Sequence, residues 1–573
     1  MKKLIIAVTI IFTFNLFSNG LYTPPKENKF SPRAEYFINS GTKENKAFVI
    51  YFTDKNVLDQ KSYEEAISKV EISEKALNRR AKTFRRQDNL ISFSDLPVHQ
   101  GYIEELGLKN IRSESKWFNF VSAEITADKA IEVSKNNFVR YIDILPAKGK
   151  KLDTKSIEVN SSKDPRFYGD AYDQVNQINI PAVHDLGYHG EGVTLLIIDT
   201  GFKKDHEVFD SLTVIGERDF IFDDNNVSLD SNDVITYQET HGTACWSIAA
   251  GYKPNTLVGP AYRSNFLLAK TEDYLNESTL EEDYMVEALE WGEALGADVV
   301  SSSLGYSEFD DPLQNYAYED MDGETAICTQ GAKRAAYLGV LICNSMGNSG
   351  GDTWKYMTAP SDADSIISVG AVDLNGDIAL FSSYGPTYDG RIKPEVVAWG
   401  VNNYTAVYTS TTSYGTGSGT SYSTPLTAGV ACLLLSAHPE WTNMDVREAM
   451  MMTADRSSNP DTDGRYGWGL IDALAAVNYN PTGIETTENL VSGIKLYNYP
   501  NPFNPETVIH YTDLAKNSKI NIYNISGKLI SEYSNLSGSG KINFNAENLP
   551  AGVYFCSVNN ENMMNTIKML LLK

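Results

Sequence analysis

The feature that most constrains the fold is a series of apolar runs in the middle of the chain, each long enough for one buried strand. The four clearest runs are residues 193–199, 266–272, 297–303 and 339–345. Helical patterns lie between them, over 280–295 and 325–338. Strands that are apolar throughout are buried on both faces, and their alternation with helices indicates a mostly parallel sheet covered on both sides. We predict such an α/β domain over residues 164–478, with functional residues at the carboxyl ends of its strands.

Different patterns flank this domain on each side. Residues 21–150 mix strand patterns with helical ones, including a basic helix over 72–86, which predicts a small α+β domain. A polar connector over 479–491 leads to residues 492–573, where short alternating strands and turns predict an all-β sandwich. Several domains are expected, because the chain has 573 residues and one core usually serves ~250 to 300.

The first 20 residues predict a secretory signal peptide. Lys2 and Lys3 precede an apolar run over 4–17, and small residues follow it, with cleavage near Gly20. The run is shorter than the ~20 residues of a membrane span, and no later run is long enough, so we expect no transmembrane anchor. The net charge of −25 also argues against nucleic acid as a partner.

The cysteines do not indicate a disulfide framework. There are five of them, an odd number, without the spacing of metal ligands. Each has apolar or small neighbours, which favours buried free thiols. A bridge between Cys328 and Cys343 is the alternative.

Three polar residues of the central domain each stand in a segment that contains glycine. Asp199 ends the first apolar strand, His241 begins a helix in HGTA, and Ser421 begins another helix in GTSYSTP. A serine hydroxyl becomes a nucleophile only when a base takes its proton and a carboxylate orients that base. The three residues therefore predict a hydrolytic triad, and the glycines before Ser421 are expected to let the backbone approach a substrate.

The segments IIDTGF, HGTA and GTSYSTP resemble the signature blocks of the subtilisin-like serine proteases, in that family's order of Asp, His and Ser. SSSLGY resembles the family's substrate-lining strand, which implies that the backbone of Ser303, Leu304 and Gly305 pairs with an extended peptide. SMGNSG resembles its oxyanion block, which implies that Asn348 is the side-chain donor. One departure is Tyr422, which stands where methionine is usual beside the nucleophile.

The flanking domains also resemble known types. Residues 21–150 are similar to the propeptides of these proteases, which implies a domain that assists folding and occupies the active site until it is cut off between Ala147 and Arg166. An independent binding module is the alternative. YPNPFNPETVIHY and LPAGVYF resemble the type A sorting domain of the type IX secretion system of Bacteroidetes-like bacteria. This implies passage through the periplasm and across the outer membrane by that machinery, with a carbohydrate- or protein-binding sandwich as the alternative.

Together these resemblances imply a secreted or surface-attached serine endopeptidase. It would hydrolyse proteins or peptides through an acyl-enzyme and mature by losing its propeptide. A catalytically inactive cell-surface protein on the same scaffold is the alternative. An α/β-hydrolase esterase is disfavoured, because its acid and histidine follow the serine, and only His438 and His510 follow Ser421.

No cofactor is required for this chemistry. The resemblance implies that structural calcium can be present, since subtilisin-like folds often bind it. The loops over 309–311 and 461–464 offer carboxylates, but calcium needs six to eight oxygen ligands, so these residues alone do not establish a site.

Overall fold

The computed structural model describes most of the chain. The described residues are 23–41, 43–57, 59–144, 167–233, 235–273, 279–309, 315–460, 464–481, 496–499, 505–524, 528–546, 549–550, 552–560 and 563–571. The predicted signal peptide, the predicted cleavage region between Ala147 and Arg166 and nearly all of the connector lie outside them. The chain divides into two units, Met1–Asn480 and Pro481–Lys573, and each is described by itself.

The central domain is built on a seven-stranded sheet in which every pairing is parallel, in the order β13-β12-β11-β10-β5-β9-β6. Its strands are β5 (Thr194–Asp199), β6 (Thr213–Asp219), β9 (Asn265–Lys270), β10 (Val299–Ser302), β11 (Leu341–Ser345), β12 (Ile367–Val372) and β13 (Val396–Trp399). The four apolar runs thus form β5, β9, β10 and β11, which confirms the predicted parallel sheet.

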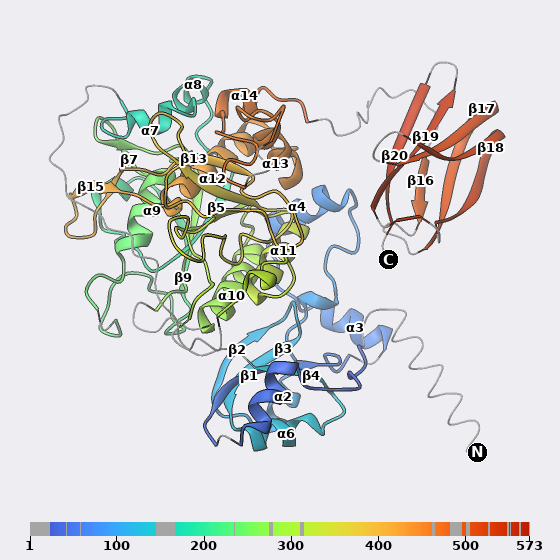
Figure 1. Cartoon of the computed structure of the whole chain (residues 1–573), viewed down its shortest axis with the longest axis horizontal. Coiled ribbons are helices and arrows are strands. Elements are labelled where there is room, and N and C mark those ends of the chain that lie inside the picture. Colours follow the sequence, from blue (N-terminus) through green and yellow to red (C-terminus); the bar gives the residue numbers. More distant parts are fainter. Residues whose placement is uncertain are drawn as a thin grey trace. The chain divides into compact units, whose positions relative to one another are not determined.

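Helices cover both faces of this sheet (Figure 1). The helices on one face are α9 (Thr240–Ala250), α12 (Thr420–Ala437) and α13 (Asn443–Met452), and those on the other are α10 (Leu280–Leu295) and α11 (Ile327–Tyr337). Successive side chains of a strand point to opposite faces. Leu195 and Ile197 of β5 pack with α9 and α12, whereas Leu196 and Ile198 pack with α10 and α11. The same alternation places Asp199 on the face of α9 and α12.

Short elements complete the central domain. They are α7 (Tyr172–Asn176), α8 (Ile180–Asp185), η2 (Glu207–Phe209), β7 (Tyr252–Lys253), β8 (Leu257–Val258), η4 (Tyr318–Asp320), β14 (Asn403–Ala406), β15 (Tyr414–Gly417) and α14 (Ala473–Val477). All five cysteines are buried and unpaired, as predicted, so Cys328 and Cys343 form no bridge. Among the described residues, no helix has both the length and the apolar character that crossing a membrane requires.

The N-terminal domain is an antiparallel sheet in the order β2-β3-β1-β4, with helices around it. Its elements are α2 (Pro32–Asn39), β1 (Lys46–Phe52), α3 (Gln60–Ile67), α4 (Glu74–Phe84), η1 (Phe93–Asp95), α5 (Gln100–Leu106), β2 (Ile111–Ser115), β3 (Phe120–Ile125), α6 (Ala127–Ser134) and β4 (Val139–Ile144). Side chains such as Phe48 and Ile50 pack under α2, α5 and α6. On the opposite face, Phe120 packs against Val286 of α10 and Ile327 of α11. The predicted α+β domain therefore lies directly on the central domain.

The C-terminal unit is an antiparallel assembly of five strands. They are β16 (Leu496–Tyr499), β17 (Glu506–Asn524), β18 (Leu529–Asn545), β19 (Gly552–Asn560) and β20 (Met563–Leu571). The first half of β17 pairs with β16 and its second half with β19, while β18 follows both halves. Ile509 and Ile522, from the two halves, lie in one buried cluster with Phe544, so the long strands bend around a single core. This agrees with the predicted all-β domain.

Candidate active site

Asp199 and His241 meet at the carboxyl edge of the central sheet. Asp199 is the last residue of β5 and is fully buried, and His241 lies in the first turn of α9. The Nδ1 atom of His241 lies 2.7 Å from Oδ1 of Asp199. The same carboxylate oxygen accepts a hydrogen bond from the Thr200 amide at 2.8 Å. Because a carboxylate can only accept here, Nδ1 carries the hydrogen, and Nε2 is the nitrogen that gains or loses a proton.

The glycine after His241 is what allows this contact. A Cβ atom at Gly242 would lie 2.3 Å from the carbonyl oxygen of Gly201 and 3.1 Å from Cβ of Asp199. Real Cβ atoms do not approach backbone this closely, so only glycine lets α9 begin so near the end of β5. Glycine at position 242 is therefore required for the close packing that brings His241 to Asp199.

The electrostatics of this pair favour a protonated imidazole. Burial disfavours the charged form of His241, but the adjacent Asp199 carboxylate outweighs burial and raises the pKa of His241 well above 6.5. Cys245, one turn further along α9, lies with its sulfur 3.8 Å from Nδ1 of His241. Burial raises the pKa of the Cys245 thiol. Asp199 makes the largest contribution that raises the pKa of His241, and the neighbouring Cys245 adds a smaller one.

Ser421 lies in the first turn of α12 and is buried. Its hydroxyl donates a hydrogen bond to the carbonyl oxygen of Ser303, with an oxygen to oxygen distance of 3.1 Å, and the Ser303 hydroxyl donates in return to the Ser421 carbonyl at 2.8 Å. The structure thus brings Ser421 to the strand that was expected to line the substrate. Cys245 connects it to His241, because the same sulfur that touches the imidazole lies 3.4 Å from the Ser421 carbonyl oxygen.

Asn348 lies beyond the end of β11, beside the start of α12. Its side-chain oxygen accepts hydrogen bonds from the Thr420 amide at 2.9 Å and from the Thr420 hydroxyl at 3.0 Å. A backbone amide can only donate, so this contact fixes which end of the Asn348 side chain faces α12. Within the described part of the chain, the Asn348 NH₂ group makes no hydrogen bond, and the residue is only half-buried. Its two donors are therefore free to bind a group next to Ser421.

The segment Ser303 to Gly305 continues directly from β10. The Leu304 carbonyl is held by the Asn344 amide and the Ser345 hydroxyl, each at 3.2 Å. A Cβ atom at Gly305 would lie 2.0 Å from Oγ1 of Thr358. This glycine therefore allows the segment to pack closely over Thr358.

One of the glycines before Ser421 has a packing role that the sequence did not indicate. The approach of a substrate to these glycines stays a prediction. At Gly417, in β15, a Cβ atom would lie 2.5 Å from the hydroxyl oxygen of Tyr422. This glycine makes room for the large side chain that replaces the usual methionine.

Sequence reasoning also missed two residues that shape the site. Cys245 touches the His241 imidazole, and a signal existed, because residues four apart on a helix share one face. Thr420 orients Asn348, but only its position next to Ser421 hinted at this role.

Among the described residues, the only group of three metal-binding side chain types with converging atoms is Asp199, His241 and Cys245. Its atoms belong to the carboxylate, imidazole and thiol groups whose contacts are described above. Of the loops that could bind calcium, 309–311 and 461–464 lie mostly outside the described residues. Calcium binding therefore stays a prediction.

Family models match three stretches of the chain. Residues 190–469 match the subtilase family, residues 47–162 the peptidase S8 propeptide domain of Bacteroidota, and residues 498–573 the secretion system C-terminal sorting domain. These matches confirm the resemblance drawn from the sequence for each of the three domains.

Relatives of the chain point the same way. Subtilisin NAT of Bacillus subtilis subsp. natto is 29% identical over 376 residues, which are 65% of this chain and 84% of the relative. Subtilisin of Bacillus pumilus is 31% identical over 304 residues, 53% of this chain and 97% of the relative. Serine protease AprX of Bacillus subtilis (strain 168) is 28% identical over 323 residues, 50% of this chain and 66% of the relative. The chain therefore belongs to the subtilisin family of serine endopeptidases, with a Bacteroidota propeptide before the protease domain and a secretion sorting domain after it.

Proposed function

We propose that this protein hydrolyses peptide bonds of proteins through the triad Asp199, His241 and Ser421, and that it matures by losing its N-terminal propeptide. The observation that carries the proposal is the 2.7 Å contact of His241 Nδ1 with Asp199, which leaves Nε2 as a base at the edge where Ser421 begins α12. The sorting domain assigns the protein to the type IX secretion route of Bacteroidota, so it acts outside the cell or on its surface.

The first chemical step is attack by Ser421 on the carbonyl carbon of a peptide bond. The Ser421 hydroxyl turns from the Ser303 carbonyl toward His241, and Nε2 takes its proton as the new bond between oxygen and carbon forms. Asp199 stabilises the imidazolium that results. His241 then gives the proton to the leaving amine, and a water molecule releases the acyl group from Ser421 by the same steps.

The oxyanion that forms on the carbonyl oxygen needs donors that are already in place. Asn348 can supply one, because Thr420 holds its oxygen and leaves its NH₂ group free. The Ser421 amide, at the N-terminus of α12, supplies a second donor with the favourable field of a helix start. The extended backbone of Ser303, Leu304 and Gly305 would pair with the peptide and hold its carbonyl at this place.

Covalent labelling tests the proposal. A fluorophosphonate should phosphonylate Ser421, because the activated hydroxyl attacks phosphorus and fluoride leaves, and peptide mass mapping should locate the adduct. His241→Ala should slow the labelling strongly, because the base is missing. Labelling that is absent from the mature wild-type protein, or that lies on another serine, would remove the basis of the proposed mechanism.

Replacement of Asn348 by alanine should lower kcat by about 10²- to 10³-fold with little change in KM, because the lost donor acts mainly in the transition state. Initial rates on a chromogenic peptide at several concentrations would show this. Asn375→Ala, at an exposed turn, is the matched control and should keep the wild-type kcat. A rise in KM at constant kcat would instead assign Asn348 to ground-state binding.

Replacement of Gly305 by alanine should lower kcat/KM by roughly 10²-fold, because the new Cβ must displace the strand from Thr358, and shifts near 1 Å misplace a substrate. Adding Thr358→Ala should recover part of the loss, since it removes the oxygen that lies 2.0 Å from the new methyl group. Kinetics of both variants and of Thr358→Ala alone make the comparison. Equal activity of the single and double variants would show that the collision is not the cause.

A further inference from the structure

One face of the propeptide sheet packs on α10 and α11. The propeptide also contacts the protease domain at a second place, at the end of the central sheet opposite to its catalytic edge. We call this place the arginine anchor: residues 73–96 of the propeptide, which comprise α4 and the turn up to η1, with the residues that they touch. Asp199 and Ser303 lie at the carboxyl ends of β5 and β10, whereas the anchor reaches the opposite ends of these strands. Lys75 of α4 contacts Thr194, the first residue of β5, at 2.6 Å, and its ammonium lies 2.6 Å from Asp298, just before β10.

Arg79 enters the protease domain where two of its helices end. The guanidinium donates to the carbonyl oxygens of Ala297 at 2.5 Å, Glu293 at 3.1 Å and Leu338 at 3.3 Å. The last carbonyls of a helix lack partners within the helix and carry partial negative charge. Arg79, which is buried, donates to carbonyls in the last turn of α10 and just beyond the ends of α10 and α11, and it also pairs with the Glu293 carboxylate.

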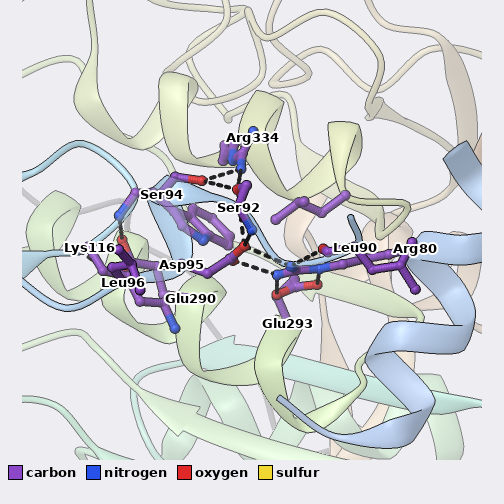
Figure 2. A network of polar contacts seen from close by, with 12 residues as sticks. Arg80, Leu90, Ser92, Ser94, Asp95, Leu96, Lys116, Glu290, Glu293 and Arg334 are labelled. Carbon is purple, nitrogen blue, oxygen red and sulfur yellow. Dashed lines mark hydrogen bonds and ion pairs between the residues drawn. The ribbon is translucent and has the colours of Figure 1, made fainter. Parts of the chain in front are cut away.

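Arg80 connects Glu293 to the propeptide's own acid (Figure 2). Its guanidinium donates to the two carboxylate oxygens of Glu293 at 2.9 and 2.6 Å, and to the two of Asp95 at 2.9 and 2.8 Å. All three side chains are at most 1% exposed. Since Arg80 and Asp95 both belong to the propeptide, that half of the contact does not depend on the protease domain. Glu293 is the only one of the three that the protease domain contributes.

Close packing surrounds these charges. The Ser73 amide, just before α4, donates to the Ala294 carbonyl at 2.9 Å. A Cβ atom at Gly339 would lie 2.1 Å from Oγ1 of Thr83, so this glycine lets α4 lie against the start of β11. In the turn after α4, Arg334 of the protease domain contacts the hydroxyl of Ser94 (Figure 2). The propeptide segment and the protease-domain surface that it touches are therefore complementary in charge and in shape.

We infer that the arginine anchor holds the propeptide on the protease domain after the chain between them has been cut, independently of the active site. Glu293 and the helix-end carbonyls form the receiving surface, and the partner is the segment 73–96 of this same chain. Removing one member of a buried, hydrogen-bonded ion pair leaves the other charge without compensation, which is strongly unfavourable. Loss of either arginine should therefore weaken the bound propeptide by about 100-fold or more. The inference rests on the proposed function only in that maturation includes this cut.

The test measures binding without activity. In full-length Ser421→Ala protein, the recognition sequence of a site-specific protease is inserted within residues 145–166, the chain is cut there, and native mass spectrometry follows propeptide loss on dilution. Arg79→Gln and Arg80→Gln each should raise the dissociation constant by about 100-fold or more. Arg86→Gln, on an exposed residue just after α4, is the matched control and should change it little.

Folding and pair specificity are checked separately. Thermal unfolding of each uncut variant shows whether it folds, and for a variant that does not, Glu293→Gln tests the same contact from the protease side. Arg80→Gln combined with Glu293→Gln should weaken binding less than the product of the two single effects, because both remove one shared pair. Three results would each contradict the inference: unchanged binding of the arginine variants, an equal loss of binding in Arg86→Gln, or effects of Arg80→Gln and Glu293→Gln on binding that multiply fully. Failure of wild-type protein to cut itself would count against the proposed function alone.

Discussion

Replacing Ser421 with alanine is expected to lower kcat by about 10⁶-fold, the loss typical of a triad serine, and to leave the propeptide covalently attached. Without the hydroxyl there is no atom to form the acyl-enzyme, and His241 has no proton to take. Intact mass of the purified chain, beside hydrolysis of a chromogenic peptide, measures both effects. Wild-type protein should lack the N-terminal domain and be active, and the variant should retain that domain and be inactive.

Ser436→Ala is a suitable control for this prediction, because it makes the same change in the last turns of the same helix. Its hydroxyl contacts Glu191 at 3.3 Å and lies away from the site, so maturation and activity should match the wild type. If Ser421→Ala lost its N-terminal domain as readily as the wild type, another protease would be responsible for the cut. If it also kept wild-type activity, Ser421 would not be the nucleophile.

Replacing Asp199 with asparagine should lower kcat by about 10⁴-fold at neutral pH and move the acid limb of the kcat/KM profile to lower pH. The base must be neutral to work, so activity falls as the pH drops through the pKa of His241. In the wild type Asp199 raises that pKa well above 6.5, which places the limb above this pH. In the variant the carboxylate is gone and burial, which lowers the pKa of His241, dominates. Rates between pH 5 and 10 would separate the two profiles.

Asp210→Asn controls for a general change in charge, because Asp210 is exposed. Its profile should overlay the wild-type profile. An acid limb that stays in place when Asp199 is replaced would mean that another group sets it, and the pairing of Asp199 with His241 would then not control the base.

Much of the fold followed from local patterns. The apolar runs became strands of a parallel sheet, and the helical pattern over 280–295 has the bounds of α10. Such patterns show whether a segment is buried on one face or on two, and this burial determines whether it forms a strand or a helix here. In the N-terminal domain, by contrast, α2, α3, α5 and β2 were not predicted. Of these, α2 buries only Ala34 and α3 buries no residue, so no apolar stripe marks either helix in the sequence.

The residues of the site were predicted from the sequence, but their contacts with one another and with neighbouring residues were not. Asp199 stands at the end of an apolar strand, and His241 and Ser421 at helix starts, so their places could be inferred from position alone. The resting contact of Ser421 with Ser303 depends on a side-chain rotation that no pattern records. The role of Arg80 could not be foreseen either, since its partner Glu293 lies 213 residues away in the sequence. Only the tertiary structure shows that Arg80 of the basic helix pairs with the Glu293 carboxylate.

The arginine anchor has a consequence for the way in which activity begins. While the chain is intact, the anchor closes within one molecule, so its closure does not depend on how much protein is present. After the cut, the same contacts join two separate molecules, and their occupancy falls as the mixture is diluted. Every precursor yields one protease and one propeptide. Export into a large volume therefore shifts the balance toward free protease, to a degree set by the dissociation constant of the anchor.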